Sequence, residues 1–377
     1  MPIFIGLMSG TSADGVDASL VDISQIDGKH SIKPIGHYYL PFPNDFAQQI
    51  RSLYQSDHNE VESVGVVSQQ LSHLYARAVS SLLDQQSIQP EQICAIGNHG
   101  QTIRHCIDFK PAFSVQIGNN ALLAELTGID VIGDFRSADI AAGGQGAPLV
   151  PAFHQRIFAR NQTNQVIVNI GGIANITAIN QTGDVIAGFD TGPGNALLND
   201  WILKHQQVNF DKDGLWAKSG TVNNHLLTLL VQDDYFSRPA PKSTGREYFH
   251  LAWLENKLAQ FSDGISAGDI SPQDVQATLV DLTAATIINA VKTYFSSADI
   301  WICGGGVHNS LLMQRLKFYA GSNFAVASSA DKGIDPDWVE SQCFAWLAFC
   351  FNQRLPANIP ALTGANKSKI LGCLYPA

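Results

Sequence analysis

A short run of small and acidic residues near the start of the chain has the composition of a phosphate-binding loop. Residues 10–17 read Gly-Thr-Ser-Ala-Asp-Gly-Val-Asp. Glycine lets a phosphate approach backbone N–H groups closely, and the hydroxyls of Thr11 and Ser12 add donors. The carboxylates of Asp14 and Asp17 repel phosphate, but they suit Mg²⁺ that is held through water. An Asp-Gly turn that closes a β-hairpin is the alternative interpretation. The candidate ligand contacts are Gly10, Thr11, Ser12, Ala13, Asp14, Gly15, Val16 and Asp17.

A second run places a carboxylate among glycines, where an expected strand ends and a helix begins. Residues 188–195 read Gly-Phe-Asp-Thr-Gly-Pro-Gly-Asn. Open α/β sheets carry ligands at the carboxyl ends of strands, and a helix N-terminus attracts phosphate. Asp190 cannot hold phosphate itself, but it is well placed to act as a general base beside one. We predict Asp190 as the catalytic base and Gly192, Gly194 and Asn195 as phosphate contacts; a helix-capping aspartate is the alternative.

Two further glycine runs follow expected strands in the second half of the chain. Gly171 and Gly172 follow the apolar segment 165–170, and three consecutive glycines follow segment 300–303. A flat backbone surface of this kind suits a nucleotide base or ribose, and Asn309 is placed to cap the next helix. The predicted nucleotide contacts are Gly171, Gly172, Gly304, Gly305, Gly306 and Asn309.

Polar stretches in the first half have the composition of a sugar site. Residues 97–102 and 134–146 mix glycine with hydrogen-bonding side chains, as a ligand with many hydroxyls requires. Arg136 is suited to pair with a carboxylate. Loops without ligand contact are the alternative for both stretches. The predicted substrate contacts are His99, Gln101, Thr102, Arg136, Asp139 and Gln145.

A cationic stretch in the second half, residues 242–247, reads Lys-Ser-Thr-Gly-Arg-Glu. Its two cations could neutralise phosphate, or the stretch could be an exposed charged turn.

The sequence also lacks four motifs that mark other enzyme classes. The absence of G-x-x-x-x-G-K-[ST], G-x-G-x-x-G, G-x-S-x-G and H-E-x-x-H patterns disfavours, respectively, Walker-type ATPases, dinucleotide enzymes, α/β-hydrolases and zinc proteases.

The elements that must carry these residues follow one order twice. Expected strands 3–8, 18–23 and 35–40 precede helices and further strands, and segment 165–189 begins the same way. The order predicts an α/β fold of two similar domains with mixed sheets, each presenting a glycine-rich hairpin to an interdomain cleft. We place the domains at 1–150, the sugar side with the first phosphate loop, and 151–354, the nucleotide side with Asp190. The tail 355–377 is expected to return to the first domain.

The bulk composition sets the remaining expectations. The chain has 377 residues, which suits two domains, and a net charge of −10, which disfavours nucleic acid and anionic membranes as partners. No basic segment with an apolar run opens the sequence, and no apolar run reaches the ~18 residues of a membrane helix. The six cysteines form no C-x-x-C pair, so we expect reduced thiols and a cytoplasmic protein.

As a set, these motifs are similar to one family. Residues 10–17 closely resemble the G-T-S-M-D-G-V-D loop of the anhydro-N-acetylmuramic acid kinases, with Ala13 in place of Met. Ala138 stands where the family often has a second arginine, so Arg136 lacks that neighbour. The matches extend from residue 6 to about residue 350 in the family's order. The similar stretches are residues 10–17, 97–102, 143–151, 169–175, 189–195, 242–247 and 304–309.

The resemblance implies an enzyme with two actin-like (ribonuclease H-like) domains, dependent on ATP and Mg²⁺ and usually homodimeric. Its activity would be hydrolytic opening of the 1,6-anhydro ring of anhydro-N-acetylmuramic acid with phosphorylation of O6, a step in peptidoglycan recycling. Asp190 would deprotonate the attacking water, residues 10–17 would hold the β- and γ-phosphates, and residues 304–306 would border the adenosine. An ordinary sugar hydroxyl kinase and a non-enzymatic, ATP-driven clamp of the actin or chaperone type are the alternatives.

Overall fold

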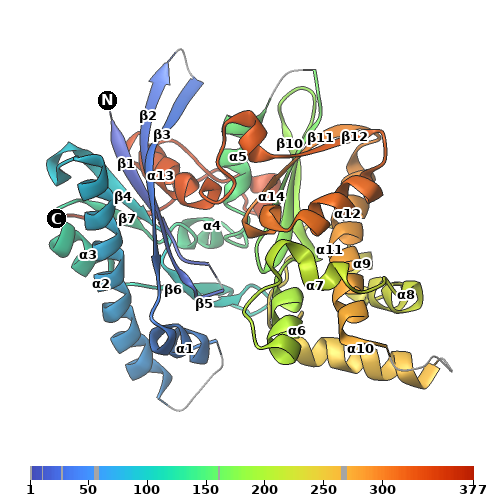
Figure 1. The fold of residues 1–377 in the computed structure, drawn as a ribbon. Helices are drawn as coiled ribbons and strands as arrows, with labels where there is room; N and C mark the ends of the chain where they lie inside the picture. Colours follow the sequence, from blue (N-terminus) through green and yellow to red (C-terminus); the bar gives the residue numbers. More distant parts are fainter. Residues whose placement is uncertain (1, 11, 27–28, 55–58, 160–161, 265–269) are drawn as a thin grey trace. The chain divides into compact units, whose positions relative to one another are not determined.

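The chain forms two compact units (Figure 1). The computed structural model describes residues 2–10, 12–26, 29–54, 59–159, 162–264 and 270–377. One unit comprises residues 1–157 and 338–377, and the other comprises residues 158–337. The division at 157 lies close to the expected boundary at 150. The return to the first unit comes at Trp338 rather than after 354, because the helix α13 (Val339–Asn352) packs on the sheet of the first unit.

The first unit is built on a mixed sheet whose described part has the strand order β13-β7-β4-β1-β2-β3. Its strands are β1 (Ile3–Met8), β2 (Gly15–Ile26), β3 (Lys29–Pro41), β4 (Ile93–Asn98), β7 (Val131–Gly133) and β13 (Cys373–Tyr375). The first three strands form an antiparallel meander; β4 runs parallel to β1, β7 runs parallel to β4, and β13 returns antiparallel to β7. A separate hairpin consists of β5 (Gln101–Cys106) and β6 (Phe113–Ile117).

The alternating side chains of β1 explain how helices cover both faces of this sheet. Ile5 and Leu7 join the apolar cluster that includes the buried stripe of α2 (Glu60–Gln86), whose members recur every three or four residues. Phe4 faces α13 instead, with its ring edge-on to Phe349 at 5.8 Å between centroids. The remaining helices are α1 (Asn44–Ser52), η1 (Pro90–Gln92), α3 (Asn120–Thr127), α4 (Ser137–Ala141), α5 (Val150–Phe158) and α14 (Pro360–Thr363).

Helix α13 lies so close to the sheet that only glycine fits beneath it. A Cβ atom on Gly6 would overlap the Ser341 carbonyl oxygen, and one on Gly97 would overlap the Phe344 carbonyl oxygen. Residues of α13 from Val339 to Cys350 are almost all buried, which agrees with the apolar composition of the helix after its polar first turn. This contact fixes the ends of β1 and β4, from which two of the predicted ligand stretches begin.

The second unit repeats the same topology with different residues. Its strands are β8 (Gln165–Ile170), β9 (Ile173–Ile179), β10 (Val185–Pro193), β11 (Ala298–Cys303) and β12 (Phe324–Ser328). The order is β10-β9-β8-β11-β12, with an antiparallel meander followed by two strands parallel to β8. In both units the sheet therefore runs third, second, first, fourth and fifth strand. The predicted α/β fold of two similar actin-like (ribonuclease H-like) domains is confirmed.

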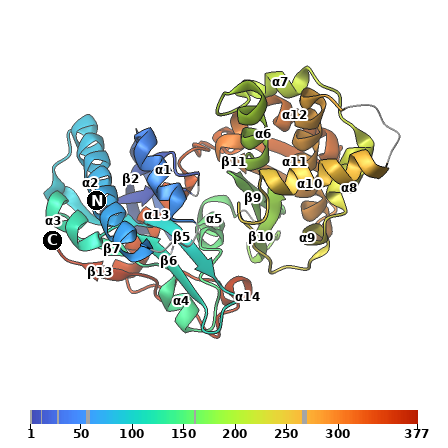
Figure 2. The ribbon, with the colours of Figure 1, turned by 90° about the horizontal axis from the view of Figure 1, so that it is seen from below.

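A long buried helix forms the centre of the second unit. Helix α11 (Pro272–Tyr294) begins as predicted at Pro272, and the Ser271 hydroxyl caps it by accepting from the Asp274 N–H at 3.2 Å. It packs on β9 and β10 and also contacts α6 and α8 (Figures 1 and 2). The other helices are α6 (Ala196–Gln206), η2 (Lys212–Gly214), α7 (Leu215–Lys218), α8 (Asn224–Val231), α9 (Asp234–Ser237), α10 (Leu251–Gly264), η3 (Gly305–His308), α12 (Ser310–Ala320) and η4 (Ser329–Lys332).

Two further features bear on the expectations from composition. All six cysteines are free thiols. Within the described ranges, no helix combines the length and the apolar character that a bilayer span requires.

Two Gly→Ala variants, one beneath α13 and one on the exposed face of α2, should have opposite effects on stability. Gly97→Ala should lower the free energy of unfolding by about 1–3 kcal/mol, because the new methyl group overlaps helix backbone. Gly65→Ala should raise it by roughly 0.5–1 kcal/mol, because Gly65 is exposed on α2, has no neighbour within 4 Å, and alanine favours helix. Urea unfolding compares the two variants. A Gly97→Ala protein as stable as the wild type would contradict the close packing of α13.

Candidate functional site

The predicted phosphate loop of the first unit joins β1 and β2 in a hairpin, with Met8 paired to Asp17. The Gly10 carbonyl accepts the Ala13 N–H at 3.1 Å, which closes a tight turn. The Ser12 hydroxyl donates to Asp14 Oδ1 at 2.8 Å. Thr11 lies outside the described residues. The turn leaves Asp14 exposed and Asp17 half-buried.

The loop residues differ in what lies around their backbone. Within the described part of the chain, a Cβ atom on Gly10 would meet only the Ser12 hydroxyl, at 3.6 Å, so a ligand has room to approach. A Cβ atom on Gly15 would press on the Tyr39 ring at 2.5 Å, so this glycine serves packing against β3. The side chains of Ala13 and Val16 are fully buried. Of these residues, Gly10 has the open backbone, and the predicted ligand contacts of residues 10–17 stay predictions.

Gln101 connects this loop to the predicted sugar stretch. Its side chain is fully buried, and its Nε2 donates to the Gly10 carbonyl at 3.0 Å and to the Tyr54 hydroxyl at 3.2 Å. The Nε2 group of Gln101 thus holds the Gly10 turn, while its buried Oε1 has no hydrogen-bond partner among the described residues, and its predicted contact with the sugar stays a prediction. Thr102, half-buried in the neighbouring hairpin, accepts from Gln116 Nε2 at 3.1 Å.

Arg136 and His99 form the centre of the predicted sugar site. Arg136 Nη2 lies 2.8 Å from His99 Nε2, and Nη1 donates to the Gly146 carbonyl at 2.7 Å. Burial lowers the pKa of His99 well below its usual 6.5, and the nearby Arg136 charge lowers it further. His99 is therefore neutral and accepts a hydrogen bond from the guanidinium at Nε2.

Helix α13 contributes two neighbours to this centre that the sequence analysis missed. The Phe344 ring lies 4.7 Å from the His99 ring between centroids. Burial raises the pKa of Glu340, while the Arg136 charge lowers it, so the two side chains interact electrostatically. The apolar pattern of residues 337–351 indicates only a core helix, which the boundary at 354 assigned to the second domain. A local pattern cannot show that the chain returns to the first unit.

Asp139 has a different position from the one predicted. It is completely buried, and its carboxylate accepts from the Gly146 N–H at 2.8 Å, the Thr363 hydroxyl at 2.8 Å and Asn358 Nδ2 at 2.6 Å. Both carboxylate oxygens bind protein donors, so Asp139 helps to shape the loop, and its predicted contact with the sugar stays a prediction. The half-buried Gln145 is tied to the same tail by its N–H, 2.7 Å from the Thr363 carbonyl oxygen.

In the second unit the three predicted glycine runs come together. The Asn195 N–H donates to the Gly171 carbonyl at 2.8 Å, and a Cβ atom on Gly305 would lie 3.9 Å from Asn195 Nδ2. Among the residues that the structure describes, a Cβ atom on Gly171, Gly172 or Gly305 would meet no atom closer than 3.7 Å, so these three glycines present open backbone. At the other predicted glycines a Cβ atom would press on neighbouring atoms, so these positions also serve packing, and their predicted nucleotide contacts stay predictions; these are Gly192, Gly194, Gly304 and Gly306. Asn309 caps α12 as expected, accepting from the Leu312 N–H at 3.0 Å.

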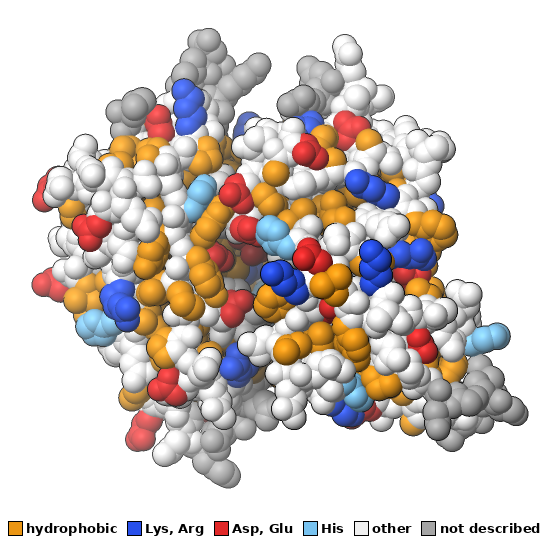
Figure 3. Space-filling view, in the orientation of Figure 1, with side chains coloured by type: hydrophobic (Ala, Val, Ile, Leu, Met, Phe, Trp, Pro, Cys, Tyr) orange, Lys and Arg blue, Asp and Glu red, His pale blue; other side chains and the backbone are white. Residues whose placement is uncertain are grey.

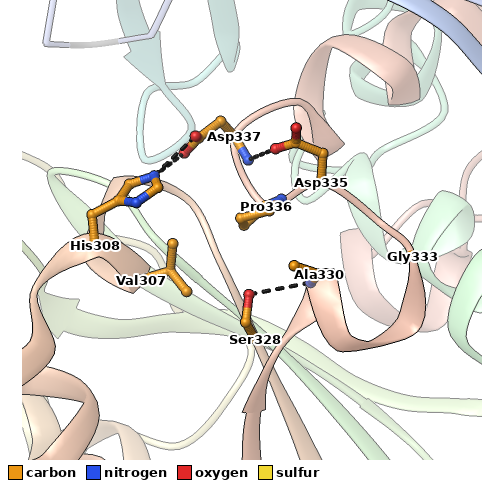
Figure 4. Close-up of a pocket in the computed structure, with 8 residues that line it drawn as sticks. All are labelled: Val307, His308, Ser328, Ala330, Gly333, Asp335, Pro336 and Asp337. Carbon is orange, nitrogen blue, oxygen red and sulfur yellow. Dashed lines mark hydrogen bonds and ion pairs between the residues drawn. The ribbon is translucent and has the colours of Figure 1, made fainter.

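An open pocket of about 620 Å³ adjoins this cluster (Figure 4). Val307 and His308 of η3 line one side, and the Gly304 N–H donates at 2.8 Å to the carbonyl of Pro336 on the other side. His308 Nε2 lies 2.8 Å from Asp337 Oδ1 at the edge of the pocket. The remaining lining residues are Ser328, Ala330, Gly333 and Asp335.

Asp190 is half-buried in β10 and is held at three points. Its N–H donates to the Lys242 carbonyl at 3.2 Å, and its carbonyl accepts from the Tyr235 hydroxyl at 2.7 Å. Its carboxylate oxygen Oδ2 accepts from the Thr244 N–H at 3.0 Å. The carboxylate is therefore oriented by a backbone donor, as a general base requires.

A family model described as anhydro-N-acetylmuramic acid kinase matches residues 2–377. This chain belongs to that family. A relative of that name from Nitrosomonas europaea is 48% identical over 375 residues, with 99% of each chain covered. Relatives of the same name from Shewanella amazonensis and Pseudomonas fluorescens are 46% and 45% identical and cover 99% or more of both chains.

In this member of the anhydro-N-acetylmuramic acid kinase family, the predicted residues gather into one cluster in each unit. The cluster of the first unit runs from Gly10 through Gln101 to the Arg136 centre. In the second unit the open glycines gather at Asn195, and Asp190 lies on β10, the strand that ends at Pro193. On the face of the molecule drawn in Figure 3, Lys and Arg side chains are scattered among acidic and uncharged ones. The mixture agrees with the net charge of −10.

The two glycines of the first loop give a matched test of ligand approach in this kinase family member. Gly10→Ala should leave the unfolding midpoint unchanged and weaken binding of a non-hydrolysable ATP analogue about tenfold, because the methyl group occupies open space beside the backbone. Gly15→Ala should instead lower the unfolding midpoint, because Tyr39 covers that position. Titration calorimetry and thermal unfolding measure the two effects. Unchanged nucleotide affinity in a folded Gly10→Ala protein would contradict the phosphate-loop assignment.

Proposed function

We propose that the chain uses ATP to open the 1,6-anhydro ring of anhydro-N-acetylmuramic acid with water and to phosphorylate O6. The products are N-acetylmuramic acid 6-phosphate and ADP, so the enzyme serves the recycling of peptidoglycan sugar. The observation that carries the proposal is the family match over residues 2–377, together with the oriented carboxylate of Asp190.

Asp190 acts as the base in this reaction. It takes a proton from the water whose oxygen bonds to the anomeric carbon, and the bond from that carbon to O6 breaks. O6 then bonds to the γ-phosphorus of ATP, and ADP leaves with the electrons of the broken phosphoanhydride bond. The phosphoryl group replaces the proton that a glycosidase acid would deliver to the leaving oxygen, so a second catalytic carboxyl group is not required.

The open glycines support the placement of the nucleotide. The backbone at Gly10, Gly171, Gly172 and Gly305 leaves room for phosphate oxygens, and Asn195 begins α6, whose N-terminus favours negative charge. The pocket beside Gly304 is the place that we propose for the adenosine. Asp335 and Asp337 at this pocket repel phosphates, so it suits the uncharged nucleoside instead.

Mg²⁺ and the sugar carboxylate have candidate partners in the first unit. Asp14 and Asp17 are oxygen donors close enough to Tyr39 that both raise its pKa, after burial as the larger cause. Such a pair fits an ion that keeps most of its waters, and bound Mg²⁺ would neutralise charge on the β- and γ-phosphates. Arg136, fixed by His99 and Gly146, is the proposed partner for the lactyl carboxylate.

We also propose a homodimer in the cytoplasm, following the resemblance. ATP is available in that compartment, and its reducing conditions suit the six free thiols.

Asp190→Asn should lower kcat by at least roughly 100-fold, because an amide cannot accept the proton of the attacking water. The affinity for ATP and the unfolding midpoint should stay near the wild-type values, since asparagine keeps the size and the hydrogen bond from Thr244. The assay combines the variant with ATP, Mg²⁺ and the anhydro sugar, and it follows ADP release and the mass of the sugar product.

Asp184→Asn is the matched control, because Asp184 is exposed at the turn before β10 and should leave kcat unchanged. A wild-type protein that forms no sugar phosphate would refute the proposed activity. An Asp190→Asn protein with near-normal kcat would refute the assignment of the base while leaving the activity intact.

A further inference from the structure

The stretch 242–244 contacts Asp190 from two directions. The Lys242 carbonyl accepts the N–H of Asp190, and the Thr244 N–H donates to its carboxylate oxygen Oδ2 at 3.0 Å. One short backbone segment therefore sets both the position of the Asp190 main chain and the direction of its carboxylate. A shift of this segment would move the carboxylate with it.

The ammonium group of Lys242 anchors that segment to a rigid neighbour. Lys242 Nζ donates to the carbonyls of Tyr235 and Phe236 at 3.1 and 3.3 Å, and it lies 4.7 Å from the Tyr235 ring centroid. These carbonyls belong to the short helix α9, where a cation is favoured. The side chain thus points toward the protein and binds carbonyl oxygens and an aromatic face.

Tyr235 contacts both Asp190 and Lys242. Its side chain is only 1% exposed, and its hydroxyl donates to the Asp190 carbonyl at 2.7 Å. Tyr235 therefore touches Asp190 through its hydroxyl and Lys242 through its carbonyl and ring. The second cation of the stretch, Arg246, pairs with Asp200 at 2.6 Å. Both cations of residues 242–247 are engaged with the protein, in contrast to the phosphate-neutralising interpretation of the sequence.

We propose that Lys242 and Tyr235 are positioning residues for Asp190, which hold the base through α9 and the 242–244 segment without contacting substrate. The inference rests on the proposed function, in which Asp190 deprotonates the attacking water. A displacement of about 1 Å in a reacting group can lower a rate by up to roughly 100-fold, so loss of one anchor should affect the chemical step. Binding of ATP and sugar should be spared.

The first test uses Lys242→Met, which removes the ammonium group and keeps the apolar stem over the Tyr235 ring. We expect kcat to fall about tenfold while KM for ATP and KM for the anhydro sugar each change less than about threefold. Arg238→Met is the matched control. The Arg238 guanidinium lies 5.7 Å from the same Tyr235 ring centroid and is exposed, so its loss should leave kcat unchanged.

Tyr235→Phe provides an independent measurement if Lys242→Met does not fold. It removes only the hydroxyl that binds the Asp190 carbonyl, and we expect a fall in kcat of a few-fold, on the order of one hydrogen bond, with both KM values unchanged. A KM for ATP raised tenfold with unchanged kcat in Lys242→Met would show that Lys242 contacts the nucleotide and would overturn the proposal. Wild-type kcat in both variants would overturn it as well.

The Asp190→Asn variant separates this inference from the proposed function. If Asp190→Asn is inactive and both positioning variants are normal, only the positioning role fails. If Asp190→Asn remains active, the base assignment fails first, and with it the reason for expecting an effect on kcat.

Discussion

A carboxylate that works beside a polyphosphate must be fixed by groups that bring it no further negative charge. Asp190, which we propose as the base, is held in this way by a backbone N–H from Thr244, the Tyr235 hydroxyl and the Lys242 carbonyl. These partners place and orient the side chain without neutralising it. They come from α9 and the 242–244 segment, where Tyr235 and Thr244 lie 45 and 54 residues from Asp190 in sequence. The second unit must therefore fold before the side chain of Asp190 has a defined direction.

The remaining polar chemistry is carried largely by the main chain. Both units contain the same meander of three strands followed by two parallel strands, and each meander turns at glycines. Glycine has two different uses in these turns. At Gly10, Gly171 and Gly305 the missing side chain leaves space for a ligand, whereas at Gly15, Gly194 and Gly304 it lets neighbouring protein atoms approach. We propose that the open glycines bind phosphates although the protein is acidic overall.

Local patterns predicted the elements that depend on local chemistry. The hairpin around residues 10–17, the start of α11 at Pro272 and the capping of α12 by Asn309 follow from turn, proline and capping preferences, and all three are present. The grouping of the glycine runs in one unit was also predictable, because strand ends in an open sheet share an edge. The ligand contacts themselves stay predictions.

Long-range contacts account for what the sequence did not predict. The return of α13 to the first unit depends on Gly6 and Gly97, which lie far from it in sequence. The burial of Asp139 depends on its hydrogen bonds to Asn358 and Thr363 in the tail. Hydrogen bonds to Asp190 come from the charged stretch 242–247, whose sequence also suited an exposed turn. None of these partners has a fixed spacing that a periodic pattern could reveal.

A reaction in water labelled with ¹⁸O tests the proposed hydrolytic ring opening most directly. The label follows the oxygen atom of the water molecule that Asp190 is proposed to deprotonate. The reaction is run briefly in labelled water with ATP, Mg²⁺ and the anhydro sugar, beside a control in which finished product stands in labelled water for the same time. Attack of water on the anomeric carbon predicts one labelled oxygen per sugar phosphate above the control, and none in the transferred phosphoryl group. A sugar phosphate with no label beyond the control would contradict hydrolytic ring opening, and label found in free phosphate would indicate hydrolysis of ATP instead.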